Sequence, residues 1–242
     1  GASLSAGTLN ADGSWTLTAD QLSGLTLTPG LHSDGDFTLT VTATSREGAN
    51  GDTATTVVSV PVTLTAVADA PTLTASAAAG TEDTAIVLNI AAALVDTDGS
   101  ESLASITIAG VPDGATLSAG TANADGSWTL TPAQLSGLTL TPAANSDADF
   151  TLTVTATSVE GANGSTASTT VTVPVSVNAV ADAPTLTASA EAGTEDTAIA
   201  LNIAGALTDT DMSESLASIT IAGVPDGASL SAGTLNADGS WT

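Results

Sequence analysis

The chain has 242 residues, and its 26 aspartate and glutamate residues stand against one arginine and no lysine, for a formal net charge of −25. Nucleic acids and anionic membrane surfaces are therefore excluded as partners, because binding to phosphate needs lysine and arginine. Hydrophobic residues make up 42% of the chain, which is too many for a disordered acidic tail. Cysteine is absent, and no apolar run approaches the roughly 20 residues of a membrane-spanning helix.

The sequence repeats at one fixed interval. Residues 1–16 return at 114–129 and again at 227–242, with offsets of 114 − 1 = 113 and 227 − 114 = 113. A period of this length matches the size of one independent domain. We therefore expect residues 69–181 to form one complete repeat, residues 1–68 the C-terminal part of another, and residues 182–242 the N-terminal part of a third. The two incomplete parts would be completed by adjacent molecules in a crystal.

Strand signals dominate the complete repeat. Short runs of alternating apolar and polar residues, rich in Thr, Val and Ile, are separated by Asp-Gly and Asn-Gly turns. In chain order the predicted strands are 71–76, 84–90, 103–109, 115–118, 128–141, 149–157 and 166–177. A helical turn at 131–137 interrupts the fifth strand, with Thr131 as N-cap, Pro132 at N1 and Gly137 as the stop.

These seven strands predict an all-β fold of Ig-like or cadherin-like sandwich domains. An odd number of alternating strands places the two ends of each domain at opposite poles, so that consecutive domains join end to end in a rod. In the strand at 149–157 we expect Phe150, Leu152, Val154 and Ala156 to face the core, with threonines on the other face. We also expect Trp15, Trp128 and Trp241 to be core residues. The joint at 178–184 and its counterpart at 65–71 are too short and too poor in Gly and Ser to be flexible spacers.

Acidic side chains gather at the predicted joints. Strand parity places Glu82, Asp83, Asp147 and Asp149 at the C-terminal pole of the complete repeat. The joint itself contributes Asp182, and a loop of the next repeat brings Asp209, Asp211 and Glu214 from the other side. Carboxylates from several loops are the oxygen ligands that Ca²⁺ prefers, and without a cation they would repel one another. The alternative is that Asp-x-Asp-Gly segments only form Asx turns on a solvated surface. Turn roles are what we expect of Asp113 and Asp125.

Several motifs resemble those of a known group. Thr81-Glu-Asp-Thr84, Asp96-Thr-Asp98, Ser146-Asp-Ala-Asp149 and Ala181-Asp-Ala-Pro184 resemble the calcium motifs of cadherin-like repeats. The whole repeat, with its Asn-Ala-Asp-Gly-Ser-Trp-Thr-Leu-Thr-Pro stretch, is similar to the tandem extender domains of giant bacterial RTX adhesins. The resemblance implies type I secretion, an extracellular location on the bacterial surface, and calcium at the joints of a stalk that holds a ligand-binding tip for attachment or biofilm formation.

The resemblance also implies a set of Ca²⁺ ligands. At one joint these would be Glu82, Asp147, Asp149, Asp182, Asp209 and Asp211, and at the other Asp34, Asp36, Asp69, Asp96 and Asp98. The neighbouring acidic residues Asp83, Glu101, Glu195, Asp196 and Glu214 complete the candidates. The chain departs from the family at three points: each joint lacks the Asp-x-Asn-Asp-Asn segment of cadherins, Gly99 is replaced by Met212 in the next repeat, and the glycine-rich nonapeptide of RTX proteins is absent.

An enzyme is not expected. The chain has no cysteine or lysine, no phosphate-binding glycine loop, and a single histidine, His32, whose counterpart one repeat later is Asn145. We therefore assign His32 no catalytic or ligand role. The main expectation is a non-catalytic extender whose partners are neighbouring repeats of the same chain. The alternative is an adhesion module that binds a surface, a glycan or ice through the outward threonine rows of the last two strands.

Overall fold

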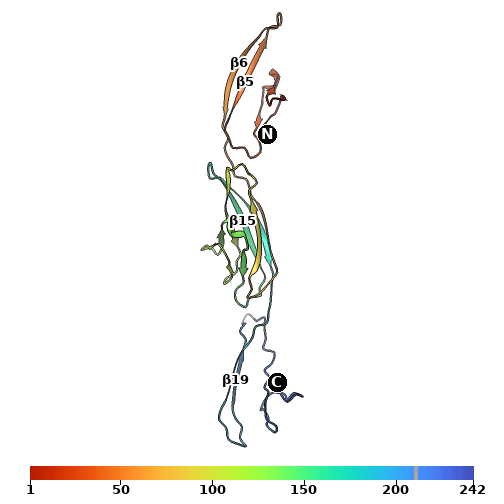
Figure 1. The fold of residues 1–242 in the computed structure, drawn as a ribbon, viewed down its shortest axis with the longest axis vertical. Coiled ribbons are helices and arrows are strands. Elements are labelled where there is room, and N and C mark those ends of the chain that lie inside the picture. Colours follow the sequence, from red (N-terminus) through yellow and green to blue (C-terminus); the bar gives the residue numbers. More distant parts are fainter. Residues whose placement is uncertain (210–211) are drawn as a thin grey trace.

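The computed structural model describes residues 1–209 and 212–242, and it is an all-β protein with two short 3₁₀ helices. The chain is elongated (Figure 1), with residues 1–68, a central pair of sheets and residues 182–242 following one another along its long axis. Among the described residues, no helix is long and apolar enough to cross a membrane.

The larger sheet of the central part has five antiparallel strands. Its order is β12 (Thr121–Ala122), β13 (Trp128–Leu130), β10 (Glu101–Ala109), β15 (Phe150–Glu160) and β16 (Thr166–Val175). The long hairpin of β15 and β16 pairs from Phe150 with Val175 to Val159 with Thr166. β10 pairs with β15 across a β-bulge between Leu103 and Ser105.

The second central sheet has four strands, in the order β11 (Thr116–Leu117), β14 (Thr139–Thr141), β9 (Ile86–Ala93) and β7 (Thr72–Ala77). A short parallel pair of β8 (Gly80–Thr81) and β17 (Val177–Asn178) brings the end of the central part back beside its beginning. The two sheets share one hydrophobic core of buried Leu, Ile, Val and Ala residues between Leu73 and Val177, an arrangement compatible with a β-sandwich.

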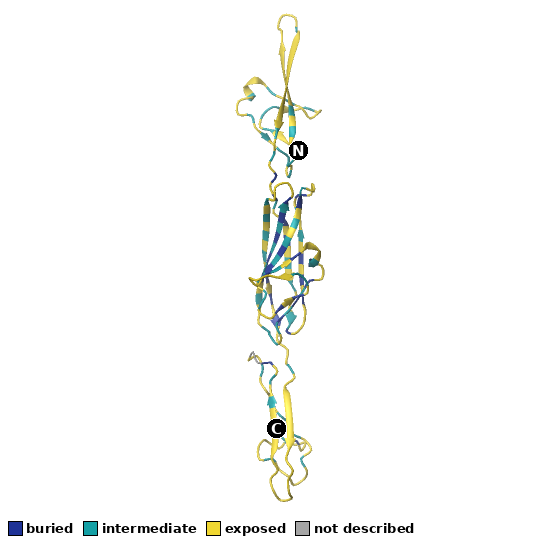
Figure 2. Cartoon of the chain, turned by 90° about the vertical axis from the view of Figure 1, so that its left-hand side faces the viewer, coloured by how far each residue is buried: buried dark blue, intermediate teal, exposed yellow. Residues whose placement is uncertain are grey.

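Burial follows the predicted alternation in the central part (Figure 2), where the dark-blue buried residues are concentrated. Leu152, Val154 and Ala156 of β15 are fully buried, while the threonines between them are not. The helical turn is also confirmed: η2 (Pro132–Leu135) follows Thr131, whose N–H donates to Gln134 Oε1 (2.8 Å). This bond satisfies a backbone donor at the start of the turn, and Leu135 anchors the turn in the core.

Two sequence-based expectations need correction. The predicted fifth strand, 128–141, is two strands in different sheets, because η2 carries the chain from β13 in the larger sheet to β14 in the smaller one. Trp128 is half-buried and packs against the core from its edge, and Trp15 and Trp241 are likewise only partly buried. The core is therefore entirely aliphatic.

The flanking parts consist of short pairs and exposed hairpins. Residues 1–68 contain β1 (Ser3–Leu4), β2 (Thr8–Leu9), β3 (Trp15–Thr16), η1 (Ala19–Gln21), β4 (Leu27–Thr28), β5 (Phe37–Arg46) and β6 (Thr53–Val62). The described residues after 181 form the hairpin of β18 (Thr185–Ala190) and β19 (Leu201–Ala206). The strands β5 and β6 pair over their whole length, yet most of their side chains are exposed (Figure 2).

Candidate metal sites at the two joints

The first joint is the linker between β6 and β7, and it is held by the backbone of Asp69. The Asp69 N–H donates to Glu101 Oε1, and the Asp69 carbonyl accepts a bond from Ser158 Oγ (2.5 Å). Glu101, the first residue of β10, is only 7% exposed. Its second oxygen, Oε2, is buried and has no hydrogen-bond partner among the described residues. One buried carboxylate oxygen therefore faces this joint unpaired.

The loop between β9 and β10 brings two further carboxylates. Asp96 is 6% exposed, and it accepts bonds from the Asp98 N–H (2.9 Å) and from Ser100 Oγ (3.3 Å). Asp98 in turn accepts the Ser100 N–H (2.8 Å), and this bond holds the pKa of the Asp98 carboxyl below its usual value. The Asp-Thr-Asp segment thus folds into an Asx-type turn that presents the Asp96 carboxylate in a fixed orientation.

His32, from the part of the chain that precedes the linker, also contacts the first joint. Its Nδ1 lies 2.7 Å from Asp69 Oδ2, and this hydrogen bond raises the pKa of the imidazole. His32 has a φ of +56°, in the left-handed region, and Asn145 occupies the equivalent turn position one repeat later with a φ of +55°. Possible ligand atoms of His32, Asp69 and Asp96 lie within 4.8 Å of one another. Of the residues that the structure describes, only these three form such a group.

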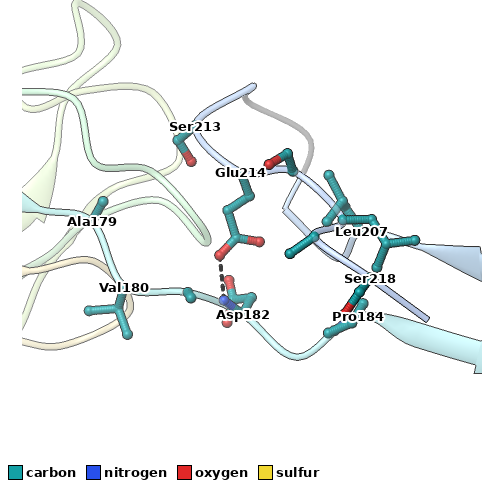
Figure 3. A pocket seen from close by; sticks show the side chains of 12 residues that line it. Ala179, Val180, Asp182, Pro184, Leu207, Ser213, Glu214 and Ser218 are labelled. Carbon is teal, nitrogen blue, oxygen red and sulfur yellow. Dashed lines mark hydrogen bonds between the residues drawn. The ribbon is translucent and has the colours of Figure 1, made fainter. Parts of the chain in front are cut away.

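The second joint repeats the linker contacts. The Asp182 N–H donates to Glu214 Oε1 (2.5 Å; Figure 3), as Asp69 does to Glu101. The Glu82 side chain is 3% exposed and accepts the Val180 N–H through Oε1 (2.5 Å). Glu82 Oε2 and Asp182 Oδ2 are buried and, among residues 1–209 and 212–242, have no hydrogen-bond partner. Two unpaired carboxylate oxygens therefore flank the same linker.

A pocket of about 490 Å³ lies beside this linker, lined by Val180, Asp182, Pro184, Leu207, Ser213 and Glu214 among others (Figure 3). Asn145 spans the joint, because its Nδ2 donates to the carbonyl of Thr208 (3.2 Å) while its own N–H donates to Asp83 Oδ1 (2.9 Å). Asp209 is almost fully buried and accepts a bond from Ser213 Oγ (2.7 Å). The predicted loops thus meet at the linker.

The remaining predicted Ca²⁺ ligands are placed less favourably for binding an ion at the joints. Asp36 and Asp149 accept backbone N–H groups of Leu64 and Val177, both at 2.9 Å, within their own repeats. Asp34 and Asp147 are half-buried in the preceding loops, and Asp34 lies outside the group of His32, Asp69 and Asp96. Glu195 and Asp196 are exposed between β18 and β19, at the opposite end of that hairpin from the joint. Asp211 lies outside the described residues.

Asp125 has the turn role that the sequence predicts. Asp125 Oδ1 accepts bonds from Ser127 Oγ (2.7 Å) and from the Ser127 N–H (3.0 Å), and these bonds lower the pKa of the Asp125 carboxyl. Asp12 and Asp238 make the same contacts in their copies of the turn. These three side chains stabilise a turn and lie outside the metal candidates.

His32 is the residue that sequence reasoning missed. Its replacement by Asn145 in the next repeat argued against a role, yet it contacts a predicted ligand directly. The available signal was its place in the chain, two residues before Asp34 in a loop that faces the joint.

Comparisons with models of protein families, with curated proteins and with solved structures find no match to this chain.

Proposed function

We propose that this chain is part of the stalk of a large secreted bacterial adhesin, a non-catalytic extender in which Ca²⁺ at the joints holds consecutive repeats in line. The observation that supports the proposal is the set of buried carboxylate oxygens without partners among the described residues. Glu101 Oε2 lies at the first joint, and Glu82 Oε2 and Asp182 Oδ2 lie at the second. The repeating unit of the stalk would be a seven-stranded Ig-like domain of 113 residues, complete at 69–181.

A bound cation would offset the free-energy cost of burying carboxylate oxygens that have no hydrogen-bond partner. A buried polar group without a partner costs about 1–3 kcal/mol, and more when it is charged. The chain offers almost no positive charge to neutralise these carboxylates, since Arg46 is its only basic residue besides His32. Ca²⁺ accepts six to eight oxygen ligands at roughly 2.3–2.6 Å in tolerant geometry, which suits carboxylates that come from a linker and from loops. The carboxylates at both joints therefore offer the oxygen ligands that calcium takes.

Asp69 and Glu101 would bind the ion at the first joint, together with Asp96. Glu82, Asp182 and Glu214 would do so at the second. The first set would tie the linker to the central part, and the second set, with Glu82 and Glu214, would tie the linker to both neighbours, so binding would restrict the motion of the linkers. A free Ca²⁺ concentration of 100 times the dissociation constant adds about 2.7 kcal/mol to the stability of the bound state. Extracellular calcium modules have dissociation constants of about 10⁻⁴–10⁻³ M, so the stalk would stiffen outside the cell.

The test is small-angle X-ray scattering and thermal unfolding of the chain in millimolar Ca²⁺, in a chelator, and in Mg²⁺ at the same concentration. We expect Ca²⁺ to give a longer maximum dimension and a clearly higher melting temperature. Mg²⁺ should reproduce little of either effect, because it requires near-ideal octahedral geometry. Identical scattering and melting in Ca²⁺ and in chelator would refute calcium at the joints. The double variant Glu101→Gln/Asp182→Asn, which keeps the shape of both side chains, should lose the calcium response.

A further inference from the structure

One of the differences between the two joints falls at a turn position that has a left-handed φ in both. His32 and Asn145 occupy equivalent places with nearly identical backbone angles, φ +56° and +55°. His32 contacts the linker carboxylate of Asp69, whereas Asn145 reaches past the linker to the carbonyl of Thr208. At this position the two joints thus differ in the side chain and in the group that it contacts, while the φ angle is nearly the same.

Three possible donors lie together at the first joint, and a fourth carboxylate adjoins them. His32 Nδ1 lies 2.7 Å from Asp69 Oδ2, and a carboxylate oxygen of Asp96 falls within the same 4.8 Å group. The adjoining carboxylate is Glu101, which lies outside that group: its Oε1 accepts the Asp69 N–H, and its buried Oε2 has no partner in the described part of the chain. Glu101 is more than nine-tenths buried, so bulk water does not solvate this unpaired oxygen.

A nitrogen among the donors changes which ion the site prefers. Imidazole is a good ligand for Zn²⁺ and for divalent ions such as Cu²⁺ and Ni²⁺, while Ca²⁺ selects oxygen. Zinc is held by histidine nitrogen and carboxylate oxygen at about 2.0–2.2 Å in four-coordinate sites. Two atoms that lie 2.7 Å apart need to separate by only about half an ångström to share such an ion.

The positions of the donors are also fixed before any ion arrives. The Asp69 backbone is held by Glu101 and by Ser158, and the Asp96 carboxylate by the Asp98 N–H and Ser100 Oγ. The contacts from Ser158, the Asp98 N–H and Ser100 come from groups outside the proposed ligand set, and contacts of that kind orient metal ligands and raise affinity.

We propose that His32, Asp69, Asp96 and Glu101 form a transition-metal site of the Zn²⁺ class at the first joint, while the second joint, with Asn145, prefers Ca²⁺. The proposal rests on the proposed function in treating the joints as metal sites, and it adds that neighbouring joints of one stalk differ in the ion they select.

The experiment uses Zn²⁺ as the probe and the imidazole as the reporter. His32 is the only histidine, so one set of imidazole signals in a ¹H–¹⁵N spectrum reports on this joint alone. Zn²⁺ titrated into the chain should shift these signals with a stoichiometry of one, and calorimetry should give the same stoichiometry. Both His32→Asn and Glu101→Gln should weaken zinc binding by tenfold or more. The swap His32→Asn/Asn145→His should move zinc binding to the second joint.

The outcomes separate this inference from the proposed function. Zinc binding that is undiminished in His32→Asn, or imidazole signals that do not shift, would overturn the zinc site even if Ca²⁺ raises the melting temperature. Weakening by His32→Asn but not by Glu101→Gln would indicate a surface histidine with adventitious zinc, and would also overturn it. A chain that responds to Zn²⁺ but not to Ca²⁺ would uphold the first-joint site and refute calcium in the stalk. Circular dichroism of each variant checks that the sheets remain folded.

Discussion

Glu82 is a single buried carboxylate whose two oxygens have different environments. Oε1 accepts the Val180 N–H, and Oε2 has no partner among the described residues. We predict that Glu82→Gln has opposite effects with and without calcium. In chelator, the free energy of unfolding should stay the same or rise, because a neutral amide costs less to bury than an unpaired carboxylate. In millimolar Ca²⁺ it should fall below wild type by about 2 kcal/mol, which is most of what a well-occupied site contributes.

Urea unfolding in both conditions measures this difference. Asp113→Asn is the matched control, since Asp113 is exposed in a turn and should change neither value by more than about 0.5 kcal/mol. If Glu82→Gln lowers stability equally with calcium and with chelator, the carboxylate stabilises the linker without an ion.

Asp125 gives a prediction of pH dependence. Its hydrogen bonds from Ser127 lower the folded-state pKa below the ordinary value of 3.8. A lowered pKa means that the stabilisation is fully present above the unfolded-state value and is lost as the pH falls through the folded-state value. Asp125→Ala should therefore be less stable than wild type at about pH 7, and the deficit should shrink below about pH 3.8. Urea unfolding at both pH values in calcium-free buffer measures it. A deficit that is the same at both values would mean that the side chain acts through its shape alone.

At the scale of elements, one strand sequence occurs in two environments. Phe-Thr-Leu-Thr-Val-Thr-Ala-Thr-Ser stands at 37–45 in β5 and at 150–158 in β15. Val154 is fully buried beneath the second sheet, while its counterpart Val41 is 50% exposed. We predict that Val154→Ala lowers the free energy of unfolding by about 2 kcal/mol, from two lost methyl groups and the cavity that they leave. Val41→Ala should change it by less than about 0.5 kcal/mol.

Urea unfolding at low micromolar protein concentration compares the two variants, with hydrogen exchange of β15 amides to localise the loss. Equal costs at the two positions would contradict the observed difference in burial, since the local sequences are identical.

The same pair of strands shows what the sequence can and cannot predict. Period-two alternation predicts the hairpin and its inward face in both copies, because strand geometry is local. It cannot predict that Val154 is buried and Val41 is not, because burial depends on a second sheet. The crossing of η2 between sheets has the same cause: Thr131 and Pro132 predict the turn, and only packing decides which sheet receives β14.

In the candidate sites, too, the sequence predicts some of the contacts, while others depend on how the chain packs. Strand parity predicts that loop carboxylates meet the linker, and the contacts of Asp69 with Glu101 and of Asp182 with Glu214 agree with it. It does not distinguish Asp96, which joins the group with Asp69, from Asp36, which accepts a backbone N–H of its own repeat. The role of His32 depends on a contact across 37 positions of sequence, which no local pattern contains.

At the scale of the whole molecule, the two flanking parts of the chain correspond to the two halves of one repeat. Residues 1–68 repeat 114–181, and residues 182–226 repeat 69–113. In the central part these two stretches pack on each other, with β10 pairing along β15 and β7 lying against β16. The counterpart of β10 lies at 214–222 and the counterpart of β15 is β5, at opposite ends of the chain (Figure 1). Large apolar side chains are exposed on both hairpins, including Val58 and Leu186.

We therefore predict that the chain associates end to end with a second copy, residues 182–226 of one molecule packing on residues 1–68 of the next. Such a contact is heterologous and does not close, so it extends to longer species as concentration rises. Sedimentation velocity in millimolar Ca²⁺ and moderate salt, where the charge of −25 is screened, should show this growth. Val41→Asp, on the exposed face of β5, should abolish it and leave the melting of the central sheets unchanged. Val87→Asp, at a comparably exposed position of β9, should associate like the wild type. A monomer at every concentration, or a Val41→Asp variant that associates normally, would mean that the hairpin faces do not recognise each other.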